Sequence, residues 1–347
     1  MKKWLCTLVL MLLPLCAFAA PDTPYDPALM IHYPRLTAAQ QQIFDKVYTA
    51  AMLGEEKVEL PEHPLYDDAC AAMDALLLDC PELCALSGAY RVGYYQNKPQ
   101  EAIYIELSYT MPIAAQRETV QAAGNLAEQA VGDELQREWI LHDLLCQQTT
   151  YDMEAANAHN AYGALVEGRA VCDGYAKAMT LLLRITGLES GVVQGKIRST
   201  GGPHAWNLVK VDGAYTWLDV TNDDQSAITT YFFFNLTDQW LQRSYILETK
   251  GMPACEDFSV NWHQYNWRYV SAEDDLQKHI LNNFRNMAKY GSRFCLRFEN
   301  RSDYLSLREG VYRWAIQYNK MGESPLDGAM KTYFDDAQQC VIIEFDK

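Results

Sequence analysis

The fold of this chain is decided by residues 161–224, which read AYGALVEGRAVCDGYAKAMTLLLRITGLESGVVQGKIRSTGGPHAWNLVKVDGAYTWLDVTNDD. Cys172 stands at the start of a run whose apolar residues recur at helical spacing. His204 follows a Gly-Gly-Pro turn and begins HAWNLVKV, which has the character of a strand. Asp219 lies in YTWLDV, a second strand-like run after the turn Asp212-Gly213. Two adjacent strands packed against a helix would bring these three side chains together.

These three residue types, in these local settings, predict covalent acyl chemistry. A thiol on the first turn of a helix faces unpaired N–H groups and the positive end of the helix dipole, so its thiolate is favoured. An imidazole next to that thiolate acts as base and acid, and a carboxylate orients the imidazole. Considered one at a time, each of the three residues could also have an ordinary structural role. Cys172 would be a small buried hydrophobe or half of a disulfide, and His204 and Asp219 would be surface, core or turn residues. Their joint arrangement favours a Cys-His-Asp triad.

The same stretch resembles the transglutaminase-like superfamily, specifically the bacterial secreted branch of the papain-like cysteine enzymes. The resemblance rests on three blocks in the expected order, YGALVEGRAVCDGYAKA, GPHAWNLVKVDGAYTWLDVT and YFFFNLTD, and covers roughly residues 135 to 240. It implies that Cys172 is the nucleophile, His204 the general base and acid, and Asp219 the group that orients the imidazole. Two positions depart from the family pattern. Asn222 stands where many relatives have Trp, and Asp173 stands where Glu is common.

The resemblance implies attack on an amide carbonyl and a thioester intermediate, which water or an amine then resolves. The choice between hydrolysis and transamidation stays open at this point. We expect one oxyanion donor from the backbone of Cys172 and a second from a side chain upstream, with Tyr162 as the candidate and Gln147 or Gln148 as alternatives. Trp206 and Trp217 flank the His-Asp pair in sequence, and they either line the groove or belong to the core of the sheet.

The ends and the charge of the chain limit where it acts and what it binds. Residues 1–19 have the charged start, apolar stretch and small-x-small end of a secretory signal peptide. Leu15 before Cys16 disfavours a lipoprotein anchor, and no later run is long enough to span a membrane. The expected location is therefore secreted or periplasmic. The chain has 29 basic and 45 acidic residues, and loss of two lysines with the signal leaves 27 against 45, a net charge of −18. So acidic a surface excludes nucleic acid as a partner.

Length and pattern predict several subdomains in an α+β chain. We expect an N-terminal α+β subdomain over 28–110, with helices at 37–53 and 64–78 and strands at 88–95 and 102–109. A papain-like catalytic domain over 112–255 should follow, with its catalytic helix packed on an antiparallel sheet. The tail, 270–347, should form an αβαβ unit with helices at 272–290 and 303–320 and strands at 292–299 and 330–346.

Ten cysteines occur, of which eight remain after the signal peptide. With Cys172 assigned to catalysis an odd number is left, so at least one further free thiol is expected, and the connectivity of any disulfides stays undetermined. Cysteine spacing indicates no zinc site, and nothing in the sequence calls for an organic cofactor. His159 is a candidate groove residue, with an ordinary loop position as the alternative.

Two rival functions remain for the sequence. One is a noncatalytic cell-surface binding module that retains the transglutaminase-like fold. The other is a thiol–disulfide enzyme, which the absence of a C-x-x-C pair around Cys172 disfavours. The expected partner is a peptide or protein substrate, with cell-wall peptide among the candidates, and the oligomeric state is undetermined.

Overall fold

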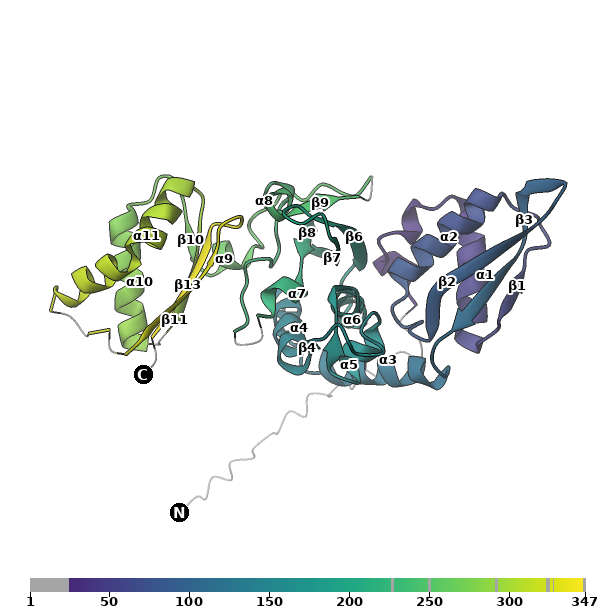
Figure 1. Ribbon diagram of the computed structural model, residues 1–347, viewed down its shortest axis with the longest axis horizontal. Helices are drawn as coiled ribbons and strands as arrows, with labels where there is room; N and C mark the ends of the chain where they lie inside the picture. The colour runs from purple at the N-terminus through teal and green to yellow at the C-terminus, as the bar shows by residue number, and fades with distance from the viewer. Residues whose placement is uncertain are drawn as a thin grey trace, which may run out of the picture.

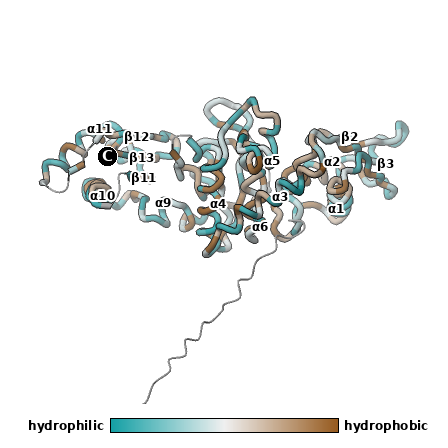
Figure 2. The backbone as a smooth tube through the Cα atoms, turned by 90° about the horizontal axis from the view of Figure 1, so that it is seen from below, coloured by the Kyte–Doolittle hydropathy of each residue, from teal (hydrophilic) through white to brown (hydrophobic). Residues whose placement is uncertain are grey.

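The structure of the protein is a computed structural model. It describes residues 25–225, 228–248, 251–290, 293–322, 325–326 and 328–345. Three parts follow one another along the long axis of the molecule, in chain order from right to left in Figure 1, and a perpendicular view shows the same order (Figure 2). Each part has a cluster of buried apolar side chains of its own, and a further cluster joins the central part to the C-terminal part. The predicted signal peptide, 1–19, lies outside the described residues.

The N-terminal part packs two helices on a three-stranded antiparallel sheet of order β1-β3-β2. Its elements are the short 3-10 helices at Pro27–Leu29 and Tyr33–Arg35, α1 (Ala38–Leu53), β1 (Lys57–Glu59), α2 (Tyr66–Asp79), β2 (Leu86–Tyr95) and β3 (Lys98–Tyr109). The predicted helix start at Thr37 is confirmed, because the Thr37 side chain accepts from the Gln40 backbone and the Gln40 side chain returns the bond. Strand β1, which the sequence analysis did not predict, adds a third strand to the predicted hairpin.

The central part places one buried helix between other helices and a sheet. Its helices and strands are α3 (Ala114–Ala127), α4 (Glu134–Gln148), β4 (Thr150–Tyr151), α5 (Ala161–Leu165), β5 (Arg169–Ala170), α6 (Cys172–Ile185), β6 (Ser190–Ile197), β7 (Pro203–Val211), β8 (Ala214–Leu218), α7 (Val220–Asp223), α8 (Asp238–Ser244), β9 (Tyr245–Leu247) and α9 (Trp262–Tyr265). Helix α6 contacts α3, α4 and α5 as well as strands β6 and β7. Nearly all of its side chains from Tyr175 to Arg184 are therefore buried, which exceeds a simple one-faced helical pattern.

The central sheet has the order β8-β7-β6-β9, and every pair in it is antiparallel. The predicted Asp212-Gly213 turn joins β7 to β8, with both residues at positive φ, as a tight hairpin turn requires. Gly195 in β6 pairs with His204 in β7. A Cβ on Gly195 would lie 2.6 Å from the Trp206 ring and 2.3 Å from the Ile246 carbonyl oxygen, so only glycine fits there. The predicted α+β class, with a helix packed on an antiparallel sheet, is confirmed.

A buried ion pair joins the N-terminal part to the last turn of α6. The Nη2 atom of Arg184 lies 3.0 Å from Oδ1 of Asp79, and both side chains are almost fully buried. Asp79 also accepts backbone N–H bonds from residues 31–33, and Arg184 also donates to the Ser190 carbonyl. Because each charge is paired and hydrogen-bonded, the pair fixes where the N-terminal part sits on the central helix.

The C-terminal part contains β10 (Tyr269–Val270), α10 (Leu276–Tyr290), β11 (Arg293–Phe298), α11 (Arg301–Asn319), β12 (Met330–Asp335) and β13 (Cys340–Phe345). Its sheet has the order β10-β11-β13-β12. The expectation of one strand over 330–346 was wrong, because the chain turns back on itself between β12 and β13. The turn is held by the Asp335 carboxylate, which accepts from the Gln338 N–H, and by Gln339 at φ +50°.

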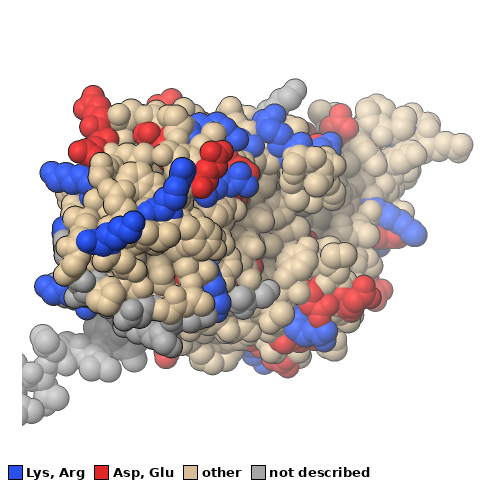
Figure 3. Space-filling model, turned by 60° about the vertical axis from the view of Figure 1, so that its left-hand side comes forward, with Lys and Arg blue, Asp and Glu red and all other residues tan. Residues whose placement is uncertain are grey.

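The described residues have a surface of mixed charge and cysteines that are all free thiols. Figure 3 shows Lys and Arg side chains interspersed with Asp and Glu side chains on the face that it presents. All eight cysteines of the described chain are free thiols, Cys172 among them. Within the described residues, no helix has the length and apolar content that crossing a membrane demands.

Candidate functional site

Cys172 is the first residue of α6, as the sequence predicts. No side chain caps this helix, so the N–H groups of its first turn are left for other partners. The preceding segment is held by the parallel pairing of β4 with β5, in which Tyr151 lies opposite Ala170. The Asp152 N–H also donates to the Ala170 carbonyl. These bonds fix the chain just before the helix, so the thiol has a defined position and remains partly exposed.

His204 and Asp219 form a buried, hydrogen-bonded pair on the sheet beside this helix. His204 is the second residue of β7, and Asp219 immediately follows β8, where it caps α7 by accepting from the Asn222 N–H. The expectation that Asp219 lies within a strand is thus corrected by one position. The Nε2 atom of His204 lies 2.7 Å from Oδ2 of Asp219. Cys172 interacts with the same imidazole, and because Nε2 is engaged by Asp219, the ring nitrogen that remains for the sulfur is Nδ1.

The surroundings keep the His204 imidazole protonated. Burial alone would lower its pKa, but the charge of Asp219, the hydrogen bond to Asp219 and the interactions with Cys172 together raise it to about 10. Burial would likewise raise the pKa of the Asp219 carboxyl. The charge and hydrogen bond of His204, with hydrogen bonds from Tyr245 and Asn222, outweigh burial and hold that pKa below its ordinary value. At neutral pH the arrangement therefore holds an imidazolium beside the Cys172 sulfur.

Two residues that the sequence analysis did not assign to the site complete the surroundings of Asp219. The Tyr245 hydroxyl donates to Asp219 Oδ2, and the Asn222 amide donates to the same oxygen at 2.8 Å. Asn222 also donates to the Tyr245 hydroxyl oxygen at 2.5 Å. With His204, three donors thus converge on one carboxylate oxygen. Asn222 could have been found as a departure from the family pattern, whereas no local signal marks Tyr245 at the start of β9.

The two tryptophans lie in the core and not on the surface. Trp206 and Trp217 are each 1% exposed, and both belong to the cluster between the sheet and the C-terminal part. The ring of Trp206 stacks on Tyr245 with centroids 4.8 Å apart and lies 5.9 Å from the His204 ring. The Trp217 indole N–H donates to Asp238. Of the two readings, the structure thus favours core packing, with Trp206 forming the floor beneath His204.

The three oxyanion candidates have different surroundings. The Tyr162 hydroxyl, on α5, lies 3.4 Å from the Glu118 carboxylate of α3, to which it donates. Gln147 is exposed at the end of α4. Gln148, the last residue of α4, has a buried Nε2 with no hydrogen-bond partner. Gln148 is therefore the only candidate of the three with an unused buried donor.

His159 and Asp173 lie near the start of α6. Both line a pocket beside the N-terminal part, and Lys177 joins them by donating to the His159 carbonyl at 3.0 Å and pairing with Asp173 at 2.8 Å. Across the described residues, no cluster of three or more His, Cys, Asp or Glu side chains is arranged to hold a metal ion.

Comparison with known proteins places the central part in a family. Residues 123–221 match the family model described as Transglutaminase-like superfamily, a stretch that includes Cys172, His204 and Asp219. No curated protein matches the chain.

Three solved structures share a weak likeness with the chain. A proposed cysteine protease from Cytophaga hutchinsonii is 11% identical with a TM-score of 0.27, and the match covers 38% of this chain and 61% of that one. A TGase is 16% identical with a TM-score of 0.30, and the match covers 55% of this chain and 54% of that one. A proposed protease from Parabacteroides distasonis is 14% identical with a TM-score of 0.25, and the match covers 36% of this chain and 29% of that one. The chain thus spans less than two thirds of the length of each of these proteins, and TM-scores this low carry no weight for the fold. The family match falls on the helix-on-sheet core of the central part, and it makes residues 123–221 a domain of the transglutaminase-like superfamily.

Proposed function

We propose that this protein is a cysteine enzyme that acts on amide bonds of peptide or protein substrates through a thioester acyl-enzyme. The observation that carries the proposal is the packing of α6, which begins with Cys172, against β7, which carries His204 bonded to Asp219 at 2.7 Å. An imidazolium and a helix N-terminus are the two surroundings that favour a thiolate nucleophile. This geometry is the one that covalent acyl transfer requires.

The proposed reaction begins when the Cys172 sulfur attacks the amide carbonyl carbon. The His204 imidazolium then gives its proton to the leaving amine nitrogen, the C–N bond breaks, and a thioester to Cys172 remains. Water or an amine next attacks the thioester while His204 takes up a proton. The C–S bond breaks and releases an acid or a new amide, which restores the starting state. Asp219 keeps the imidazole oriented throughout and balances its charge.

The oxyanion of each tetrahedral intermediate needs at least two donors. The backbone N–H of Cys172 serves as one in this proposal, because it belongs to the uncapped first turn of α6. Gln148 serves as the second, since its buried amide nitrogen has no partner in the structure. Gln148→Ala should then lower kcat with little effect on iodoacetamide labelling of Cys172. An unchanged kcat would return the role to Tyr162 or to the backbone.

The alternative, a noncatalytic binding module with the same fold, predicts a broken triad or a blocked thiol. The intact His204–Asp219 bond and the partly exposed Cys172 thiol favour catalysis instead. The signal-like residues 1–19 support action outside the cytoplasm, which a mass spectrum of the mature N-terminus from the native host would test.

A single experiment tests the activity and separates its two forms. The protein is incubated with a mixed peptide library and a small primary amine, and products and trapped acyl-enzyme are identified by mass spectrometry. New carboxyl ends indicate hydrolysis, whereas amine-tagged peptides indicate transamidation. Cys172→Ala should abolish trapping, and His204→Ala should abolish nearly all of it. Full activity in Cys172→Ala would refute the proposal.

A further inference from the structure

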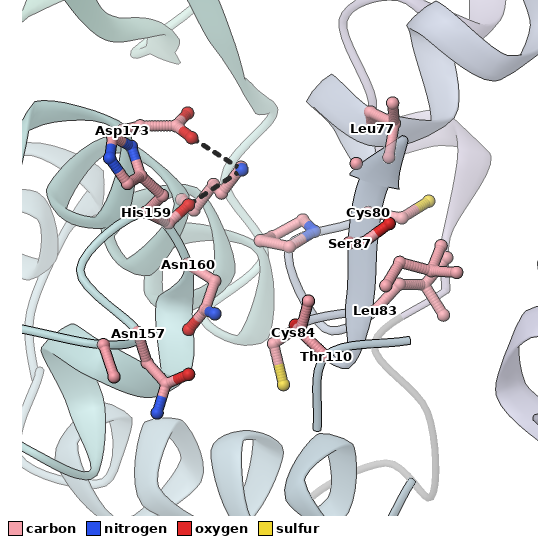
Figure 4. A pocket seen from close by; sticks show the side chains of 15 residues that line it. Leu77, Cys80, Leu83, Cys84, Ser87, Thr110, Asn157, His159, Asn160 and Asp173 are labelled. Carbon is pink, nitrogen blue, oxygen red and sulfur yellow. Dashed lines mark hydrogen bonds and ion pairs between the residues drawn. The ribbon is translucent and has the colours of Figure 1, made fainter. Parts of the chain in front are cut away.

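A pocket of about 370 Å³ lies between the N-terminal part and the first turns of α6 (Figure 4). One wall comes from residues 77–88 and Thr110, and the opposite wall comes from residues 156–160 with Asp173 and Lys177. Asp173 follows Cys172 directly, and neighbouring Cα atoms are about 3.8 Å apart. The pocket therefore adjoins the first turn of α6, which begins with the proposed nucleophile.

The catalytic-side wall is tightly built. Lys177 donates to the His159 carbonyl and pairs with Asp173, the two contacts drawn as dashed lines in Figure 4. Glycine lets the loop approach the helix, because a Cβ on Gly174 would lie 2.3 Å from the Ala158 carbonyl oxygen. A Cβ on Gly163 would lie 2.2 Å from the Asn157 carbonyl oxygen in the same way. Residues 156–160 are thus held in a fixed position against α5 and α6.

The charge of the pocket favours an uncharged ligand. Asp173 and Lys177 are the only carboxylate and ammonium groups among its lining residues, and they neutralise each other at 2.8 Å. A ligand group with a net charge would lose hydration there without gaining an unpaired counter-charge, which is costly. The opposite wall adds three leucine side chains near the hydroxyl of Ser87. The lining therefore suits an aliphatic side chain next to neutral polar groups.

Two asparagines on the catalytic side supply one acceptor and one donor. The Asn157 amide nitrogen donates to Glu167 at 2.8 Å, which leaves its oxygen unused. The Asn160 oxygen accepts from the Gly163 N–H at 3.1 Å as the cap of α5, which leaves its amide nitrogen unused. Both side chains line the pocket (Figure 4). An unused acceptor and an unused donor side by side match the N–H and C=O of a peptide backbone.

We propose that this pocket binds a neutral stretch of the acyl-donor peptide and receives one aliphatic side chain close to the attacked amide. The proposal rests on the proposed function, because it takes Cys172 as the nucleophile. It gives the N-terminal part a role, since that part supplies the leucine-bearing wall. Substrate choice would accordingly depend on residues on both sides of the boundary between the N-terminal and central parts.

The test measures binding without turnover. Cys172→Ala protein is titrated by calorimetry with glycine-alanine peptides that contain a central glutamine and a single leucine at each flanking position in turn. Matched peptides carry glutamate or lysine in place of leucine. At one or more positions the leucine peptide should bind about tenfold more tightly than its charged counterparts, a normal size for discrimination by an apolar pocket.

Three further variants in the Cys172→Ala background locate the binding. Ala156→Trp places an indole in the pocket and should weaken the leucine peptide about tenfold or more. Asn160→Asp keeps the oxygen that caps α5, removes the unused donor and adds a charge, so it should weaken the same peptide. Met153→Trp is the matched control, because Met153 is 72% exposed on the same loop and does not line the pocket. It should bind like the background protein.

The outcomes separate the two proposals. Equal binding of leucine, glutamate and lysine peptides, no measurable binding, or unchanged binding in Ala156→Trp and Asn160→Asp would overturn the pocket assignment. Acyl-enzyme trapping by the protein with Cys172 intact would still support the proposed function in each of those cases. Amide turnover that survives Cys172→Ala would overturn the proposed function instead, whatever the peptides show.

Discussion

Asp219→Asn should separate the charge of Asp219 from its shape. The substitution keeps the size of the side chain and an oxygen that can still accept from the Asn222 N–H at the start of α7. It removes the negative charge that faces His204 at 2.7 Å. In the native protein this charge is the main cause that opposes burial and raises the His204 pKa to about 10. Without it, burial dominates, and the imidazole should become neutral at physiological pH.

The size of the effect follows from these pKa values. The difference between the ordinary value of 6.5 and about 10 corresponds to about 5 kcal/mol that favours the imidazolium, at about 1.4 kcal/mol per pKa unit. Iodoacetamide reacts with the thiolate, and a neighbouring imidazolium favours that form of a thiol. We therefore expect iodoacetamide to label Cys172 about 10- to 100-fold more slowly at pH 6.5 in Asp219→Asn. The two rates should converge above about pH 9, where an ordinary thiol ionises by itself.

The assay is the rate of Cys172 alkylation between pH 5 and 10, read by mass spectrometry of the peptide that contains it. Asp238→Asn is the matched control, because Asp238 also accepts a side-chain hydrogen bond, from the Trp217 indole, without touching His204. The control should keep the native profile. The reasoning is refuted if Asp219→Asn, shown to be folded by its thermal melt, has the same profile as the native protein.

Three other predictions follow from the same contacts. Tyr245→Phe removes one of the three donors to Asp219 Oδ2, so the carboxylate should interact more strongly with His204. The change in Cys172 alkylation rate at the alkaline end of the pH profile should therefore move to higher pH, and an unchanged profile would limit Tyr245 to a packing role. Arg184→Met leaves the Asp79 charge buried without its partner, and denaturant unfolding should show a loss of about 3–5 kcal/mol, whereas a loss below about 1 kcal/mol would contradict the pairing. Stability should fall as pH rises from 5 to 9, because folding raises the Glu138 pKa to about 8, chiefly by burial, and raises the His142 pKa to about 9, where two carboxylates outweigh burial. Both groups bind protons more tightly in the folded protein. Their contribution to stability is therefore complete below the pKa values of the unfolded chain and is lost as the pH rises through the pKa values of the folded protein. A melting temperature that rises from pH 6 to 9 would refute this prediction.

The sequence predicted the positions of those candidate residues whose signals are local. Cys172 could be placed because a helical pattern begins at that residue, and His204 because a turn and a strand pattern meet there. Asp219 was expected inside a strand but lies one residue beyond it, because its carboxylate serves as the cap of α7. A cap and a strand end look alike in sequence when both fall at a polar residue after an apolar run.

Contacts between distant segments could not be predicted in this way. Tyr245 reaches Asp219 only because β9 pairs with β6 at the far edge of the sheet, and strand order does not follow from any local pattern. The buried pair of Asp79 with Arg184 joins residues 105 positions apart. The hairpin of β12 and β13 was missed for a related reason. Its turn has no glycine and depends on the Asp335 side chain and a left-handed Gln339.

The difference between residues with local sequence signals and contacts between distant segments bears on how the site can change in evolution or design. In the proposed function, the local residues determine whether acyl transfer can occur at all, since Cys172 and His204 are the groups that would exchange bonds and protons. The distant contacts determine how the imidazolium is held, because Asn222 and Tyr245 share one oxygen of Asp219 with it. Substitutions at these two positions should therefore alter the pH range of the reaction before they abolish it. A change in the pocket wall should instead alter which peptide reaches the thiol and leave the pH range unchanged.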